Sequence, residues 1–435
     1  PYRALGWKLV LHVMAAGFFM FGWVRAIGAS RAAALLAGTA YMLAPFFVSL
    51  ANPGHDGKMF VTALAPLLFH VVERHFVRPG ARSFAAIAFV VGGILLTTHF
   101  QMAYFLFGGV GLYAIFRSIQ ISRGQGVGSD PGDDGPSDDD GNPDSQGPRR
   151  VRAGSIRFAL FLLGSVLGAA GAAYQFVPAV EYVTEYSRRI QTTREAAGQT
   201  GRVWSSSFSM HPEEAMSLVI PEFPGNGAGG AAWADGTYWG RNALKDNHEY
   251  AGLVVLLLAA VSFLGAARRQ LRFFFAGLGV LALAFALGAN TPVWGLFYSL
   301  VPGIRLFRAP GMVVFLFGFG AITLAALGLD RLIDAARRRD AESLTQASKV
   351  LWIGAGVVGL LALLAGSGIL TSIWTSVVYS GIDERRAQIL AAHLPNIVRG
   401  ASVALIIAAA TAGLVLALAK EKVSARLVVV GLLAL

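Results

Sequence analysis

The chain has 435 residues, of which 55% are hydrophobic and 14% are charged, and its mean hydropathy is +0.58. Soluble proteins carry about 25% charged residues, so this composition excludes a soluble globular protein and indicates an integral membrane protein. The net charge of +11 comes mainly from arginines at the ends of apolar runs, which is typical of topology signals and not of a nucleic-acid-binding face. Cysteine is absent, which excludes disulfides, thiolate catalysis and cysteine-ligated metals.

Apolar runs close to the length of a membrane-spanning helix follow one another along the chain. We predict spans at 7–27, 31–50, 59–73, 84–98, 100–117, 156–176, 250–267, 273–289, 310–328, 350–372 and 399–419, with a twelfth beginning near 427. The sequence therefore predicts an all-α, polytopic transmembrane protein with about 11–12 spans.

The same pattern suggests an organisation into segments. We expect N-terminal spans with an outer loop at 1–120, an acidic linker at 121–155, one span at 156–176, an outer loop region at 177–249, and C-terminal spans at 250–435. Gly124 to Pro148 contains seven aspartates among Gly, Pro and Ser. Such a stretch buries too little apolar surface to offset the entropy of ordering, so we expect a disordered linker.

Arginine and lysine concentrate in every second loop, and positively charged loops remain in the cytoplasm. We expect the loops that alternate with these basic loops to face outward. They lie at 51–58, 97–101, 177–249, 290–309 and 373–398. Pro1 would then lie outside. The chain begins without a methionine, so we expect it to be part of a longer protein. If that protein starts in the cytoplasm, an odd number of upstream spans, most simply one, would place Pro1 outside.

The first outward loop contains His55, Asp56 and Lys58 between two apolar segments. Removing ionisable groups from water costs several kcal/mol, and an imidazole, a carboxylate and an ammonium together suit a phosphorylated ligand. A solvated turn is the alternative. His99 and Gln101 mark the next outward junction, where they would complete the same cavity or serve as satisfied interfacial groups.

The large outer loop offers two groups of residues. Glu181 and Glu185 would align along an interfacial helix. Trp233, Tyr238 and Trp239 could stack on sugar rings, with Asp235, Asn242 and Asp246 bonding hydroxyls. An aromatic belt at the membrane interface would explain the aromatic residues equally well.

Arg305 and Arg308 lie three residues apart between two prolines. On one face of a short interfacial helix they would bind phosphate, because a guanidinium stays charged and donates to two oxygens. Anchoring to lipid headgroups is the alternative. Walker, HExxH and Rossmann patterns are missing, and His211, Glu213 and Glu214 lack a second histidine at ligand spacing. No cofactor is therefore expected, and a divalent metal is not indicated.

Four short motifs occur in order: Tyr41 to Pro45 with Gly54-His55, Thr98 to Tyr104, Val301 to Pro310, and Gly328 to Arg331. With them the sequence resembles the YfhO-type family of bacterial membrane proteins, relatives of the GT-C glycosyltransferases, over about residues 2–331. The resemblance implies a multispanning GT-C-like fold in the bacterial cytoplasmic membrane. It also implies transfer of a sugar from a polyprenyl-phosphate donor on the outer face. The acidic catalytic residue of GT-C enzymes usually lies in the first outer loop, which here would precede Pro1.

These observations lead to a working hypothesis of a glycosyltransferase that acts on a cell-envelope glycan or lipid acceptor. Asp56 is the best visible base, with His55 beside it, and Lys58, Arg305 and Arg308 would bind the phosphate. A transporter or flippase of a lipid-linked or anionic solute is the first alternative, although such a protein should carry polar residues within its spans. A non-catalytic assembly subunit is the second.

Overall fold

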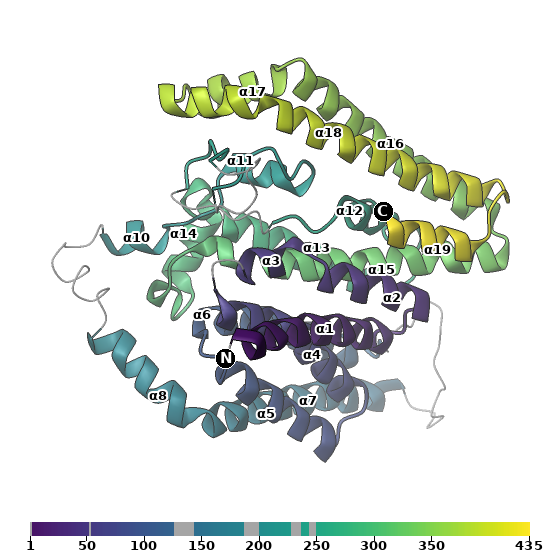
Figure 1. The fold of residues 1–435 in the computed structure, drawn as a ribbon. Coiled ribbons are helices and arrows are strands. Elements are labelled where there is room, and N and C mark those ends of the chain that lie inside the picture. Colours follow the sequence, from purple (N-terminus) through teal and green to yellow (C-terminus); the bar gives the residue numbers. More distant parts are fainter. Residues whose placement is uncertain (1, 52–53, 126–142, 187–199, 228–235, 243–248) are drawn as a thin grey trace.

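The computed structural model describes residues 2–51, 54–125, 143–186, 200–227, 236–242 and 249–435. These residues form helices and turns without a β-strand, which confirms the all-α prediction (Figure 1). Nine helical stretches within the described part are long and apolar enough to cross a bilayer. The protein is therefore a multi-pass helical membrane protein.

The helices follow one another with short connections. The first group is α1 (Tyr2–Ala26), α2 (Arg31–Met42), α3 (Pro45–Ala51), α4 (Asp56–Val77), α5 (Ala81–Leu95), α6 (Phe100–Ser122) and α7 (Pro143–Gly171). The second is α8 (Ala173–Glu181), the π-helix η1 (Tyr182–Tyr186), α10 (Thr200–Ser205), α11 (Pro212–Ala215), the 3-10 turn η2 (Met216–Leu218) and α12 (Leu253–Val261).

The C-terminal group contains the longest helices. It consists of α13 (Arg269–Ala286), η3 (Gly288–Asn290), α14 (Pro292–Leu300), η4 (Ile304–Leu306), η5 (Pro310–Val314), α15 (Phe315–Arg338), α16 (Ala341–Gly366), α17 (Ile369–Ile373), η6 (Trp374–Val378), α18 (Glu384–Ala419) and α19 (Ala425–Ala434).

The nine long stretches coincide with nine of the predicted spans, and the other three predicted spans are shorter helices. They are α5 with 15 residues, α12 with 9 and α19 with 10. The predicted run 250–267 is interrupted because Gly252 and Gly265 adopt positive φ angles of 100° and 68° on either side of α12. Nine residues rise only about 14 Å, so α12 cannot cross a hydrocarbon layer about 30 Å thick.

The predicted acidic linker is shorter at both ends than 121–155. Helix α6 continues to Ser122 and α7 already begins at Pro143, where proline is tolerated because the first helical N–H needs no partner. Residues 126–142 lie outside the described part of the chain. The expectation of disorder there remains a prediction.

The helices form layers that run in roughly the same direction (Figure 1). Helices α16 and α18 pack along one another at the top of the view, and α5 packs against α7 at the bottom. Between these pairs, α1 contacts α2 and α4, while α15 contacts α2, α12 and α13. Helix α15 is buried along most of its length, so it is the central helix of the bundle.

A cluster of aromatic rings joins five helices in the core. Trp23 of α1 contacts Phe69, Tyr113, Phe275 and Phe319 at centroid distances of 5.5–5.7 Å. The indole N–H also donates to Thr323 Oγ1 at 3.0 Å. Rings in edge-to-face contact add roughly 0.5–1.5 kcal/mol per pair beyond their burial, and this cluster therefore holds α1, α4, α6, α13 and α15 together.

A buried ion pair lies within the bundle, although the sequence suggested that the spans are nearly free of charge. Arg117 Nε of α6 lies 2.9 Å from Glu73 Oε2 of α4, and both side chains are at most 4% exposed. Tyr113 donates to the same carboxylate oxygen at 2.7 Å. Gln120 accepts from Arg117 and donates to Gln270 of α13 at 2.8 Å. These hydrogen bonds offset part of the cost of burying the two charges.

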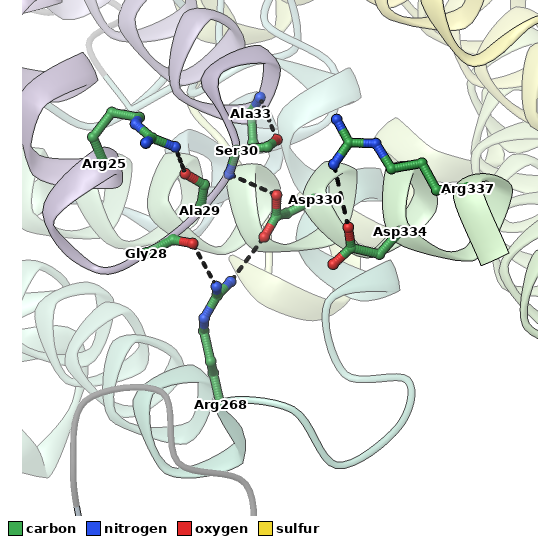
Figure 2. A network of polar contacts seen from close by, with 9 residues as sticks. All are labelled: Arg25, Gly28, Ala29, Ser30, Ala33, Arg268, Asp330, Asp334 and Arg337. Atoms are coloured by element: carbon green, nitrogen blue, oxygen red, sulfur yellow. Dashed lines mark hydrogen bonds and ion pairs between the residues drawn. The ribbon is translucent and has the colours of Figure 1, made fainter. Parts of the chain in front are cut away.

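Helices α4, α6 and α15 all begin at one end of the bundle, which we call the site end, and finish at the other, the basic end. Figure 2 shows the basic end, where three loops predicted to be cytoplasmic meet. Asp330 accepts from Ser30 N at 2.7 Å and from Arg268 Nη1 at 2.9 Å, and Arg268 also donates to Gly28 O at 2.7 Å. One carboxylate of α15 thus joins the N-cap residues of α2 and α13.

Candidate functional site

A cavity of about 330 Å³ opens at the site end between segments that are distant in sequence. It is bounded by α3, the first turns of α4 and α6, the loop before α11, the segment before α12, and residues 308–315. Its polar lining consists of Ser49, His55, Lys58, Glu214, Asn242, Glu249 and Arg308. Volumes of about 300–1,000 Å³ are usual for small-molecule sites, so the cavity can hold a polar headgroup.

The turn before α4 brings an imidazole and an ammonium to the cavity. His55 precedes the first residue of α4, where Met59 N donates to its carbonyl at 3.1 Å, and Lys58 lies in the first turn. Gly57 allows this turn to approach the neighbouring junction, since a Cβ there would lie 3.0 Å from Thr97 O and 3.1 Å from His99 Cβ. The structure therefore brings the two outward loops into contact.

His99 lies behind this turn as the N-cap of α6, where its Nδ1 accepts from Met102 N at 3.2 Å. Burial, and secondly the positive charge of Lys58, lower the pKa of His99 to about 4. The imidazole is therefore neutral at pH 7, because a cation would be both desolvated and repelled.

Arg308 lines the cavity, whereas Arg305 does not. The guanidinium of Arg308 lies 5.9 Å from the Trp204 ring and 5.5 Å from the Phe208 ring, and Gln101 donates to its carbonyl. Arg305 Nε donates to Tyr298 O at 3.1 Å, outside the cavity. The prediction that both arginines share one helix face is wrong, because the 3-10 turn η4 ends at Leu306 and Phe307 is extended.

Glu214 is the most completely hydrogen-bonded carboxylate of the cavity. It accepts from His211 N at 2.9 Å, from Tyr238 Oη at 2.7 Å, and from Asn242 Nδ2 at 2.8 and 2.9 Å. Because the donors come from both sides of the outer loop, Glu214 joins α11 to residues 238–242. These hydrogen bonds hold the Glu214 carboxyl group in a fixed position in the cavity wall.

Glu249 is the second carboxylate of the cavity and is only 3% exposed. Asp56, the base predicted from the sequence, is not among the lining residues and lies half-buried at the first position of α4. A carboxylate there stabilises the helix through its dipole, which gives Asp56 a structural role. Glu214 and Glu249 were missed as cavity residues because only the outward location of their loop was visible in the sequence.

The aromatic residues of the outer loop have different roles. Tyr238 reaches the site through Glu214, but Trp239 is 1% exposed and donates from Nε1 to Phe223 O at 2.7 Å. Trp239 packs in a second apolar cluster with Phe223, at a ring distance of 5.6 Å. Its expected contact with a sugar is therefore corrected to a packing role. Trp233, Asp235 and Asp246 lie outside the described residues.

Glu181 and Glu185 are exposed and do not line the cavity. Helix α8 ends at Glu181, and the π-helical turn η1 follows, so the regular alignment expected of one α-helix is interrupted between them. Figure 1 places α8 at the lower left, away from α11. The predicted substrate role of these glutamates is not supported by their positions.

An apolar cavity of about 400 Å³ lies beside the polar one, between α6, α13 and α14. The two share the segment η5 as a wall. Gly311, Met312 and Val314 line the polar cavity, while Val313 lines the apolar cavity. A ligand with a charged head and a hydrocarbon tail could therefore contact both sides of this segment.

The fold and site together define a multi-pass helical membrane protein with cationic and anionic side chains around one cavity at the site end. In the described part of the chain, no group of three or more His, Asp or Glu side chains has the geometry to hold a metal ion. No protein-family model, curated protein or solved structure matches this chain. The chemistry of the cavity is therefore argued from its own geometry.

Proposed function

We propose that this protein is a membrane glycosyltransferase that moves a sugar from a polyprenyl-phosphate donor to a cell-envelope glycan or lipid acceptor. In this proposal the site end faces outward from the bacterial cytoplasmic membrane. The observation that carries the proposal is the meeting of Lys58, Arg308 and Glu249 at one polar cavity, next to an apolar cavity. Cations suit a phosphate, carboxylates suit sugar hydroxyls, and the apolar cavity suits a prenyl chain.

The residues would divide the reaction between them. The acceptor hydroxyl oxygen bonds to the anomeric carbon while the bond from that carbon to the phosphate oxygen breaks. The hydroxyl proton passes to Glu249, which replaces Asp56 as the proposed base. The phosphate departs with the bonding electrons, and Lys58 and Arg308 stabilise its charge in a site partly shielded from water. Tyr238 and Asn242 donate to Glu214, and these hydrogen bonds would fix the part of the outer loop that contacts the sugar.

The first test measures binding of undecaprenyl phosphate to the full chain in detergent. Arg308→Gln should weaken binding at least tenfold, because a hydrogen bond to a charged group contributes about 1.5–3 kcal/mol. Arg305→Gln is the matched comparison, since Arg305 packs on Tyr298 outside the cavity. It should bind like the wild type. Equal losses in the two variants would indicate general surface charge and contradict the site.

The second test separates binding of undecaprenyl phosphate from transfer of the sugar. Glu249→Gln should retain undecaprenyl phosphate but lower transfer of a radiolabelled sugar from its polyprenyl-phosphate donor to membrane acceptors by about 100-fold or more. Unchanged transfer would exclude Glu249 as the base. Binding without any transfer by the wild type would favour the transporter or the assembly subunit instead.

A further inference from the structure

A second polar cavity lies at the basic end, at the opposite end of α15 from the candidate site. Its volume is about 290 Å³, and its charged lining consists of Arg268, Arg272, Arg331, Arg338, Asp330, Asp334 and Asp340. Phe315 lines the cavity at the site end, and Arg331 follows 16 residues later. At 1.5 Å per residue this separation is about 24 Å, which is close to the thickness of the hydrocarbon core.

We propose that this basic-end cavity binds the phosphate headgroup of an anionic membrane phospholipid. The proposal does not depend on the glycosyltransferase assignment. A positive-inside loop requires only that arginines occur near the membrane surface. Here four arginines from α13, α15 and the loop before α13 converge on one cavity, which topology alone does not require.

The carboxylates of this cavity already have partners. Asp330 is paired with Arg268 at 2.9 Å and also accepts from Ser30 N. Asp340 caps α16 by accepting from Ser343 N at 2.9 Å and also interacts electrostatically with Arg331. Asp334 lies 3.8 Å from Arg337 on the exposed side of α15. These contacts offset the negative charge locally.

Two guanidinium groups remain available to an anion. Among the described residues, neither Arg331 nor Arg338 makes an ion pair. Arg331 Nη2 donates only to Ser343 Oγ, at 3.4 Å, and its buried Nε has no acceptor in the described part of the chain. A guanidinium presents several donors in one plane and binds two phosphate oxygens at once.

The cavity wall is preformed by the loop between α12 and α13. Arg272 is buried and donates to Leu264 O at 3.0 Å and to Gly265 O at 2.7 Å. Gly265 then packs directly on Arg331, where a Cβ would lie 2.3 Å from Nη1. The Arg331 side chain is thus held in place before a ligand arrives, which lowers the entropic cost of binding.

Exposed aromatic side chains next to the cavity favour a lipid over a soluble phosphate. Phe263 and Phe273 are 39% and 57% exposed and contact each other at a ring distance of 5.6 Å. Each is adjacent in sequence to a residue that lines the cavity, Ser262 and Arg272. A phospholipid offers a phosphate to the arginines and acyl chains to the phenylalanines, and anionic headgroups are bound by basic pockets of this kind.

The experiment titrates the full chain in detergent with phosphatidylglycerol or phosphatidylcholine and counts bound lipids by native mass spectrometry. We expect preferential retention of phosphatidylglycerol. Arg331→Gln and Arg338→Gln should each weaken that binding about fivefold, the effect of one cationic side chain at a membrane surface. Arg339→Gln is the matched control, because it removes the same charge from the C-cap of α15 outside the cavity, where no carboxylate in the described part of the chain pairs with it.

Three outcomes would overturn the proposal. They are equal retention of both lipids by the wild type, an equal loss in the Arg339→Gln control, and displacement of phosphatidylglycerol by millimolar inorganic phosphate. The last would identify a soluble phosphate as the ligand. Arg338 is exposed, so Arg338→Gln keeps the test decisive if Arg331→Gln fails to fold in a thermal-unfolding check.

Discussion

Two neighbouring glutamates in α11 have different environments. Glu214 accepts hydrogen bonds from three groups, whereas Glu213 accepts from Arg241 N, at 2.9 Å, on one oxygen. The other oxygen of Glu213 is buried and has no partner in the described part of the chain. Burial raises the pKa of Glu213 to about 7, and the charge of Glu214 raises it in the same direction.

This difference predicts how stability depends on pH. The folded state favours the protonated carboxyl of Glu213, so its contribution is fully present below the ordinary pKa of 4.5 and is lost as pH rises through about 7. The substitution Glu213→Gln removes the titratable group and keeps a side chain of nearly the same shape. Relative to the variant, the wild type should lose up to about 3 kcal/mol between pH 4.5 and 8.

Thermal unfolding of both proteins in detergent across that pH range measures the effect. The variant and the wild type should unfold at similar temperatures at pH 4.5, and the variant should be the more stable one at pH 8. Parallel pH profiles would show that Glu213 is ionised in the folded protein at neutral pH.

At the scale of the helices, close packing depends on glycines at particular contacts. A Cβ on Gly168 of α7 would lie 2.3 Å from Ala88 O of α5, and one on Gly92 would lie 3.0 Å from Gly168 O. Both obstacles are backbone atoms, so no rotamer change could relieve the overlap. Small residues allow membrane helices to approach in this way, since the bilayer provides no hydrophobic force between them.

We therefore expect Gly168→Ala to destabilise the protein by about 1–3 kcal/mol by forcing α5 and α7 apart. Gly171→Ala, on the same helix, is the control, because no atom lies within 4 Å of its added Cβ. The control should match the wild type or exceed it slightly, since alanine is the better helix former. The measurement is the unfolding temperature of the two variants and the wild type in detergent. Equal values for the two variants would contradict the close contact.

At the scale of the whole molecule, the Glu73–Arg117 pair connects α4 and α6 inside the bundle. Glu73→Gln would leave the Arg117 cation buried without its counter-ion and should cost about 3–5 kcal/mol. A combined variant, Glu73→Leu with Tyr113→Phe and Arg117→Met, removes the ion pair and the hydroxyl that donates to it, while Gln120 can keep its hydrogen bond to Gln270. It should recover most of that loss, because well-packed apolar residues commonly replace buried ion pairs at little cost.

The measurement is again thermal unfolding in detergent, with size-exclusion chromatography to verify a monodisperse fold. A single variant as stable as the wild type would mean that the ion pair contributes little. A combined variant no better than the single one would mean that the network is needed for the packing of the bundle.

The helical architecture could be predicted from the sequence by itself. Apolar runs of spanning length and the regular alternation of basic loops are linear properties, and they identified all nine long helical stretches. The same alternation grouped His55, Lys58 and Arg308 at one end before any contact was known. Helix α5 ends earlier than predicted and α12 is shorter than predicted, because turns follow Leu95 and Val261.

Tertiary structure alone decided which of those residues share a cavity. Arg305 and Arg308 are three residues apart, yet the extended backbone at Phe307 sends only Arg308 into it. Glu249 lines the cavity and Asp56 does not, because a segment distant in sequence folds over the first turn of α4. Hydropathy and charge follow the chain residue by residue, whereas this site depends on side chains as distant in sequence as Ser49 and Arg308, which meet only when the helices pack.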